Sequence, residues 1–345
     1  MTAKRISYID MAKGIGILLV VFGHSAFPTP EVNQWISSFH MPLFFLLSGI
    51  LLAHTNAHEK PMQMLIRKKA RTILVPYFCF SILSILFTAI LDTASFGTYL
   101  PNALIQMFVF YGISVLWFLP ALFFGEIIFL FVRKRCSLVI TAVISMLICL
   151  LAVFIVNTYH YHYLIDFNSY LSLLGAYLIS VVVRTGFAVT FLALGYFSYL
   201  LFFQKEHHTA LYLVLACLFL VLNIYLAFKN GSVDLNNMVF HDYRLYFPAA
   251  FCGGMFVICL CAALPAIKPL MLTGKHSLII MATHMNCRFL GICYAAGNLI
   301  VSLLPFLGDI GYMITCIICM ILLETAAVLV INRFFPFLIG NTKKR

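Results

Sequence analysis

Three ionisable side chains in the first apolar segment, Asp10, Lys13 and His24, have types and spacing that suit acid–base chemistry. At about 100° per residue, Lys13 and His24 lie within about 20° of each other on a helix, and Asp10 lies about 60° away. Along the helix axis Lys13 and His24 are separated by roughly 16 Å, which is half a bilayer. The spacing predicts a polar stripe from one membrane surface to the opposite half. The competing interpretation is an interfacial i,i+3 pair of Asp10 and Lys13, with His24 reaching outward.

A second histidine, His40, opens the next apolar segment, in the run Phe39-His40-Met41-Pro42-Leu43-Phe44-Phe45. Only a short loop joins the two segments, so we expect His40 to lie near His24 at the outer end of both helices. Two imidazoles at one membrane level could supply a base and an acid at neutral pH. A histidine bonded to a loop carbonyl is an equally ordinary interpretation of His40.

Later apolar segments carry further ionisable side chains, which are costly in a membrane and therefore functional candidates. They are Glu126, His284, Arg288 and Glu324. His284 and Arg288 are four residues apart and share a helix face. Trp117 could stack on a sugar ring, although a buried aromatic in a span is commoner. We take Trp117, Glu126, His284 and Arg288 as candidate substrate-binding residues.

The elements that position these residues must be membrane helices. Of the 345 residues, 63% are hydrophobic and 10% are charged, whereas soluble domains average about 45–50% and about 25%. This composition excludes a soluble enzyme, a disordered chain and a nucleic-acid-binding module. It makes the lipid bilayer the main partner. The length suits an all-α polytopic bundle of about ten transmembrane helices, since each span needs about 20 residues.

Apolar runs between charge clusters and Pro/Gly positions give the expected spans. These are residues 8–27, 35–54, 72–92, 103–132, 137–156, 184–203, 209–228, 247–264, 276–303 and 310–332. The stretch 166–183 is either an eleventh span or an interfacial or re-entrant segment. With ten spans, nearly all basic residues fall on one side, and the positive-inside rule makes that side cytoplasmic. We expect residues 1–345 to form one domain without a soluble appendage, in the plasma or inner membrane, with both termini cytoplasmic.

Eleven cysteines do not predict a disulfide framework, because most of them lie inside apolar runs. Cys316 and Cys319 have CxxC spacing but lack histidine partners, so zinc or redox chemistry is not expected there. The sequence predicts neither a metal site nor a tightly bound cofactor.

Several of these motifs together resemble the membrane acyltransferase-3 family, most closely its fucose 4-O-acetylase-like branch. The first is the run from Tyr8 to Ile17 followed by Val20-Val21-Phe22-Gly23-His24, and the second is the run that begins at Phe39, with Ser48-Gly49. Arg67 and Arg71 before Ile73-Leu74-Val75-Pro76-Tyr77 match a third. Weaker echoes follow in family order, at 116–122, at 195–196 and from Gly274 to His284.

The resemblance implies a ten-helix enzyme that uses cytoplasmic acetyl-CoA or another acyl-CoA to O-acylate a carbohydrate, such as a surface glycan or a lipid-linked sugar. It also implies that His24 is the essential catalytic histidine. From their types and positions, we take Asp10 and His40 as further catalytic candidates. Lys13 occupies a position where many members have arginine, and Lys13, Arg67 and Arg71 become candidates to hold the CoA. His24 either activates the acceptor hydroxyl directly or is itself acylated.

Two other functions compete with the acyltransferase. A secondary transporter could use Asp10, Lys13, Glu126 and Glu324 as a charge relay, but the sequence has no detectable repeat and no paired interrupted helices at matching positions. A non-catalytic structural subunit has little support among so many intramembrane charges.

Overall fold

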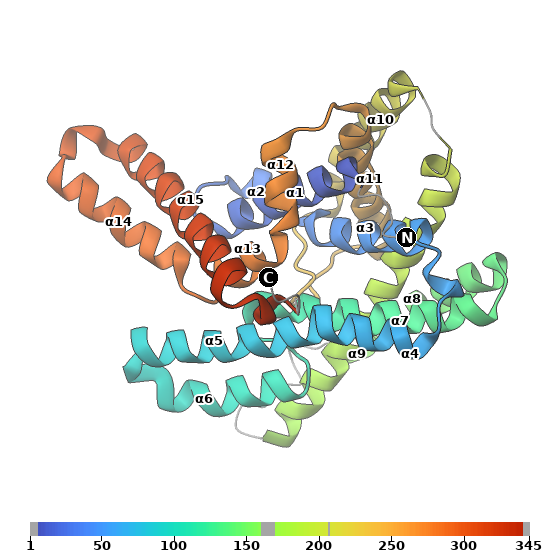
Figure 1. Cartoon of the computed structure of the whole chain (residues 1–345), viewed down its shortest axis with the longest axis horizontal. Coiled ribbons are helices and arrows are strands. Elements are labelled where there is room, and N and C mark those ends of the chain that lie inside the picture. Colours follow the sequence, from blue (N-terminus) through green and yellow to red (C-terminus); the bar gives the residue numbers. More distant parts are fainter. Residues whose placement is uncertain (1–5, 160–169, 206–207, 341–345) are drawn as a thin grey trace.

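A computed structural model describes residues 6–159, 170–205 and 208–340. The described chain is helical and contains no β-strand beyond one isolated antiparallel bridge, between Asp234 and Val239. Figure 1 shows the elements. The α-helices are α1 (Ser7–His24), α2 (Pro30–Ser37), α3 (His40–His54), α4 (Met62–Lys69), α5 (Val75–Leu91), α6 (Thr93–Phe108), α7 (Phe118–Arg135), α8 (Leu138–Tyr159), α9 (Tyr170–Ser198), α10 (Thr209–Asn230), α11 (Tyr243–Ala263), α12 (Lys268–Lys275), α13 (Ser277–Thr283), α14 (Phe289–Leu303) and α15 (Gly308–Phe334).

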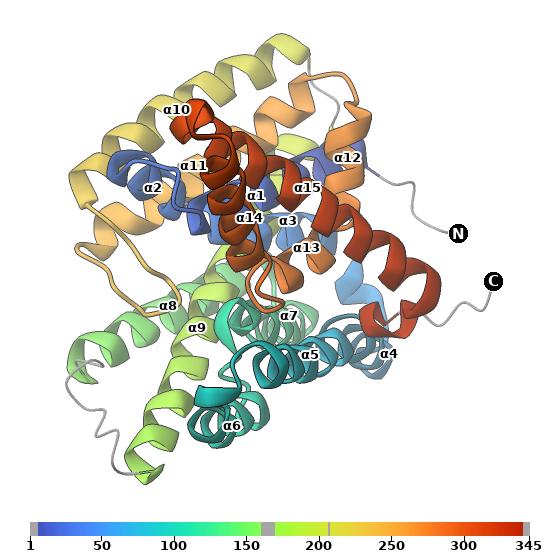
Figure 2. The same cartoon turned by 90° about the vertical axis from the view of Figure 1, so that its left-hand side faces the viewer.

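The centre of the molecule is built on α1 and α3, which pack against each other, with α11 and α12 beside α1 and with α9 against α3 (Figures 1 and 2). Helices α3 and α9 approach very closely at two glycines. A Cβ atom at Gly49 would overlap the backbone oxygen of Leu192, and one at Gly195 would overlap that of Leu46. Small residues let membrane helices approach to backbone contact, and this contact fixes α3 against α9.

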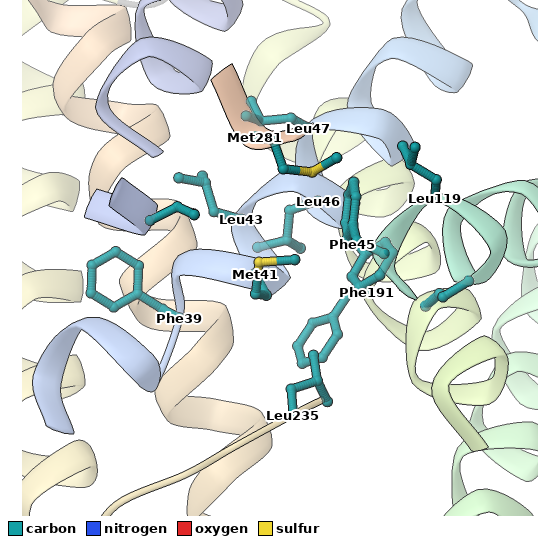
Figure 3. Packing of buried hydrophobic residues seen from close by; sticks show 14 of the residues in the cluster. Phe39, Met41, Leu43, Phe45, Leu46, Leu47, Leu119, Phe191, Leu235 and Met281 are labelled. Carbon is teal, nitrogen blue, oxygen red and sulfur yellow. The ribbon is translucent and has the colours of Figure 1, made fainter. Parts of the chain in front are cut away.

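The buried core surrounds α3 (Figure 3). Phe45, Leu46 and Leu47 are completely buried and face α7, α9 and α13 through residues such as Phe191 and Met281. Many apolar side chains on the outer helices are instead exposed, and α8, for example, buries only three residues. An apolar outer surface around a packed centre is what a helix bundle in lipid requires.

Nine described segments are long and apolar enough to cross a membrane. They cover nine of the ten predicted spans, and the all-α, polytopic architecture is confirmed. The tenth predicted span, 276–303, is divided between α13 and α14. At 15 residues, α14 is shorter than a full crossing requires.

The predicted treatment of residues 166–183 is wrong for the part that the structure describes. From Tyr170 the chain forms α9 and continues through a π-helical turn to Phe203 as one helix. It is neither a separate eleventh span nor a re-entrant segment. No proline interrupts these residues, and the charge of Arg184 is satisfied by other segments, so the helix passes through it. Residues 166–169, like the terminal basic clusters Lys4-Arg5 and Lys343-Lys344-Arg345, lie outside the described residues.

Two predicted continuous spans are interrupted. The first breaks at residues 109–117, between α6 and α7, where Phe110, Gly112 and Ser114 have positive φ angles. A Cβ at Gly112 would overlap the backbone of Trp117, so this turn requires glycine. The second breaks at 284–288, where Arg288 is left-handed. Each break therefore divides a segment that the sequence predicts as one continuous span.

Many of the basic residues of the described chain gather at one end of the bundle, which we call the basic end and define by residues 52–71, 126–135 and 196–205. Lys134 Nζ donates to the backbone oxygen of Lys60 over 2.9 Å, and a Cβ at Gly340 would overlap the Arg71 backbone oxygen. Tyr8, near the start of α1, stacks on Phe203 with ring centroids 5.5 Å apart. The first turn of α1 and the end of the described chain therefore lie at the basic end.

Candidate active site

A cavity of about 710 Å³ lies at the end of α1 that is remote from the basic end. Its walls come from the end of α1, α2, the start of α3, the break at 114–117, the loop 232–236 and the break near 285. The lining residues are Val20, Gly23, His24, Pro28, Pro30, Asn33, Gln34, Ser37, His40, Met41, Ser114, Val115, Trp117, Ser232, Val233, Asp234, Leu235, Asn236, Met281 and Met285. Irregular backbone at membrane depth is tolerated where it lines such a cavity.

His24 ends α1 and contacts a second histidine from a distant part of the chain. Its Nδ1 atom lies 3.0 Å from Nε2 of His284, and the two rings stack with centroids 5.2 Å apart. His24 retains exposed surface and lines the cavity, whereas His284 is completely buried. The pair therefore has one imidazole that a substrate can reach and one that only supports it.

A bond to a backbone carbonyl determines which nitrogen of each ring carries a hydrogen. His284 Nδ1 lies 2.9 Å from the Ile280 oxygen, which can only accept, so Nδ1 of His284 carries the hydrogen. In the neutral ring, Nε2 of His284 is then the acceptor for the Nδ1–H of His24. This assignment leaves a lone pair on Nε2 of His24, which is the atom that can take a proton from a substrate.

His40 lies on the same cavity wall as His24, as the sequence predicts. Its Nδ1 donates to the Ile36 oxygen over 2.8 Å. His40 is therefore both bonded to a backbone carbonyl and part of the cavity lining, so the two interpretations of this residue are compatible. Asp234 is the only carboxylate among the lining residues. The cavity thus combines two histidines with one negative charge.

Arg184 holds the cavity wall together from behind. It is 2% exposed, and its guanidinium donates to the backbone and side-chain oxygens of Asn236 over 2.6–3.1 Å and to the Tyr111 oxygen over 2.8 Å. It also lies against the rings of Tyr111 and Trp117, at 4.3 and 5.3 Å from their centroids. One side chain of α9 therefore joins the loop 232–236 to the break at 109–117.

The two helix breaks also meet directly. Asn286 Nδ2 donates to the Ile113 oxygen over 3.2 Å. Trp117 is the last residue of the first break. It is almost completely buried and contributes to the cavity lining. Because both breaks free backbone groups, this mutual bond and Arg184 satisfy some of them without water.

The structure places Asp10 and Lys13 far from the cavity. Asp10 is buried where α1 crosses α12, and a Cβ at Gly274 would overlap its backbone oxygen. Fourteen residues of helix separate Asp10 from His24, or about 21 Å along α1. Neither Asp10 nor Lys13 lines the cavity, and their predicted catalytic and donor-binding roles stay predictions.

The predicted donor-binding arginines, Arg67 and Arg71, are exposed at the basic end. Between them, Lys69 forms an ion pair with Glu126 over 2.7 Å, where the Glu126 side chain is 2% exposed. A π-helical turn over Ala70–Leu74 follows directly. Glu126 is thus brought to the basic end and not to the cavity, and its predicted role in substrate binding stays untested.

Arg288 and Glu324 lie beside the second break. Arg288 pairs with Asp92 over 3.5 Å, where both side chains are largely exposed. A hydrogen bond from Ser95, with a contribution from Arg288, lowers the pKa of the Asp92 carboxyl below its ordinary value. Glu324 is buried and accepts from the Thr283 hydroxyl over 2.7 Å, next to His284.

Of the ten candidate site residues, the structure gathers His24, His40, Trp117 and His284. Sequence reasoning missed the pairing of His24 with His284, and it missed Asp234, Asn236 and Arg184. Only Arg184 carried a usable signal, because an arginine inside an apolar segment marks a functional or organising position. The loop residues had no such signal, since polar residues are ordinary in a loop.

The chain is similar to a known protein family over most of its length. The family model described as an acyltransferase domain, that of acyltransferase-3, matches residues 6–325. No curated protein and no solved structure matches the chain. The matched range includes every residue of the cavity and both helix breaks.

Proposed function

The chain belongs to the acyltransferase-3 family and is a membrane acyltransferase, and from that premise we propose that it transfers an acetyl group from acetyl-CoA to a hydroxyl group of a carbohydrate. The proposal places it in the fucose 4-O-acetylase-like branch, in the plasma or inner membrane, with both termini cytoplasmic. Membership of this family also disfavours the transporter.

The observation that carries the proposal is the His24–His284 pair at the cavity. Transfer to a hydroxyl needs a base, and Nε2 of His24 has the free lone pair and the exposure for that role. The buried His284 accepts the Nδ1–H of His24 and so orients the ring and supports the imidazolium, as a carboxylate does in a catalytic triad.

The proposed step balances with these residues alone. Nε2 of His24 removes the hydroxyl proton as the oxygen attacks the thioester carbon. The C–S bond then breaks, and the imidazolium returns the proton to the leaving thiolate, which gives CoA and the ester. His40, on the same wall, is placed to bind the oxygen that gains charge or to orient the acceptor.

The basic end supports the donor side of this proposal. CoA carries several negative charges, and Arg67 and Arg71 are exposed there. Under the positive-inside rule this end faces the cytoplasm, where acyl-CoA is made. The cavity then faces the opposite side, where a glycan is available. Donor and acceptor would approach His24 from opposite ends of the bundle.

The test uses the full chain in proteoliposomes with acetyl-CoA labelled in the acetyl group and cell-envelope glycan as acceptor. We expect release of free CoA matched by alkali-labile label in the glycan. His24→Ala should lower the rate about 10²–10⁴-fold, which is the usual contribution of a general base. His54→Ala is the matched control, because His54 bonds Tyr199 at the basic end, and it should keep the rate.

Solute uptake without CoA release would support the transporter and overturn the proposal. Equal rates in His24→Ala and in the wild-type protein would remove His24 from the chemistry. Label bound to His24 in a brief reaction without acceptor would replace the direct step by an acyl-histidine intermediate.

A further inference from the structure

The charged side chains that line the cavity determine which kinds of sugar can bind there. Among its lining residues, neither lysine nor arginine is present, and Asp234 is the one carboxylate. Sites for phosphate or carboxylate groups normally present arginine or lysine side chains. This cavity instead offers amides, hydroxyls, the imidazoles of His24 and His40, and the carboxylate of Asp234.

The nearest guanidinium is already occupied. Arg184 directs its Nε, Nη1 and Nη2 donors to oxygens of Asn236 and Tyr111, and it is buried behind the wall. It is therefore a support of the loop and not a ligand for an anion. Three other cations near this end lie outside the lining. Arg244 and Arg288 pair with Asp242 and Asp92, and Lys229 lies over the Tyr225 ring, 5.6 Å from its centroid.

Asp234 is held in place by its own loop. Its carboxylate accepts from the backbone N–H and the side-chain amide of Asn237 over 3.0 and 2.7 Å. Its backbone N–H and C=O pair with Val239 over 3.0 and 2.9 Å. These bonds hold the Asp234 carboxylate in one position in the cavity lining. Its negative charge therefore acts on any charged group that enters the cavity.

The neutral polar groups are also positioned in advance. Asn236 gives its side-chain oxygen to Arg184, which leaves its amide N–H groups as donors at the wall. Gln34 donates to the Ala227 oxygen over 3.0 Å, which leaves its own side-chain oxygen as an acceptor. Donors and acceptors from different segments of the lining, together with the aromatic ring of Trp117, suit a sugar ring that carries several hydroxyl groups.

We propose that the acceptor subsite takes an uncharged sugar residue and that Asp234 excludes anionic ones, so that sugar phosphates, nucleotide sugars and uronic acids are not acceptors. The inference rests on the proposed acetyl transfer and narrows its acceptor. A lipid-linked glycan would then be acetylated on a sugar remote from its phosphate.

The test compares two probes that have the same ring hydroxyls but differ in charge, methyl α-D-glucopyranoside and α-D-glucose 1-phosphate, with the galactose and mannose pairs measured alongside. CoA release from acetyl-CoA is followed with the full chain in proteoliposomes. For the pair with the best neutral acceptor, we expect transfer to the phosphate to be at least tenfold slower. Asp234→Asn should narrow that gap several-fold.

Asp309→Asn is the control, because Asp309 is an exposed carboxylate in the first turn of α15, outside the cavity lining. It should leave the gap unchanged. Faster or equal transfer to the phosphates, or a gap that Asp234→Asn does not change, overturns the inference while acetyl transfer itself stands. CoA release that no acceptor, including envelope glycan, stimulates overturns the proposed function instead.

Discussion

The two ends of α1 use ionisable residues in opposite ways. At the cavity, His24 keeps one nitrogen directed at open space and gives the other to the buried His284. At the basic end, the buried Glu126 is closed by Lys69 over 2.7 Å. Both arrangements are costly in a membrane, but only the first leaves an atom available for chemistry. An intramembrane charge is therefore informative about function mainly through what its polar atoms face.

The Lys69–Glu126 pair gives the largest expected effect on stability. Lys69→Met leaves a buried carboxylate without its partner and should lower the free energy of unfolding by about 3 kcal/mol, at the low end of the range because Lys69 is partly exposed. The double variant Lys69→Met, Glu126→Met should recover most of this loss. Thermal unfolding in one detergent measures it, with the exposed Lys68→Met as control. A loss of acetyl transfer in folded Lys69→Met protein would contradict a purely structural pair.

The close packing of α3 on α9 gives the next effect. Gly49→Ala would place a Cβ against the Leu192 backbone and should cost about 1–3 kcal/mol of stability. Gly175→Ala, in the same helix as Leu192, meets open space and should be neutral or slightly stabilising. The difference in unfolding midpoint between the two variants tests the contact. Equal midpoints would mean that the helices can separate at no cost.

The supporting histidine should affect chemistry and not folding. His284→Leu removes the acceptor of the His24 Nδ1–H and should lower the transfer rate about 10–100-fold, or about 1.4–2.7 kcal/mol. His284→Gln should retain more activity, because its side-chain oxygen can accept that hydrogen. Initial rates across pH, together with unfolding midpoints, separate the two roles. If glutamine and leucine give the same rate and pH profile, His284 has only a packing role.

The smallest effect is expected for a change at Arg184, which supports the cavity wall from behind. Arg184→Lys keeps the charge but loses the fork that bonds Asn236 and Tyr111 together. We expect the KM for the acceptor to rise several-fold, about 1 kcal/mol, with little change in kcat. Arg244→Lys, which alters an exposed pair, is the control. A fall in kcat alone would place Arg184 closer to the reaction than its contacts do.

The overall architecture and part of the candidate site could be predicted from the sequence. Apolar runs and charge clusters indicated a membrane bundle, and the short loop between the first two segments indicated that His24 and His40 lie at the same end. The breaks at 109–117 and 284–288 could not be predicted, because their flanking segments are as apolar as a continuous span. Only a few left-handed residues mark them, and such conformations depend on the partners that satisfy the freed backbone groups.

By itself, the amino-acid sequence determined the solvent in which this protein folds, because lipid demands long apolar helices that satisfy their own backbone. It also determined which residues can exchange protons. The tertiary structure decided which of them meet. His24 and His284 are separated by 260 residues, and helical spacing relates only residues within one helix. Their contact, the position of Asp234 in the cavity that His24 also lines, and the burial of Arg184 follow from how α1, α9 and the two interrupted helices pack.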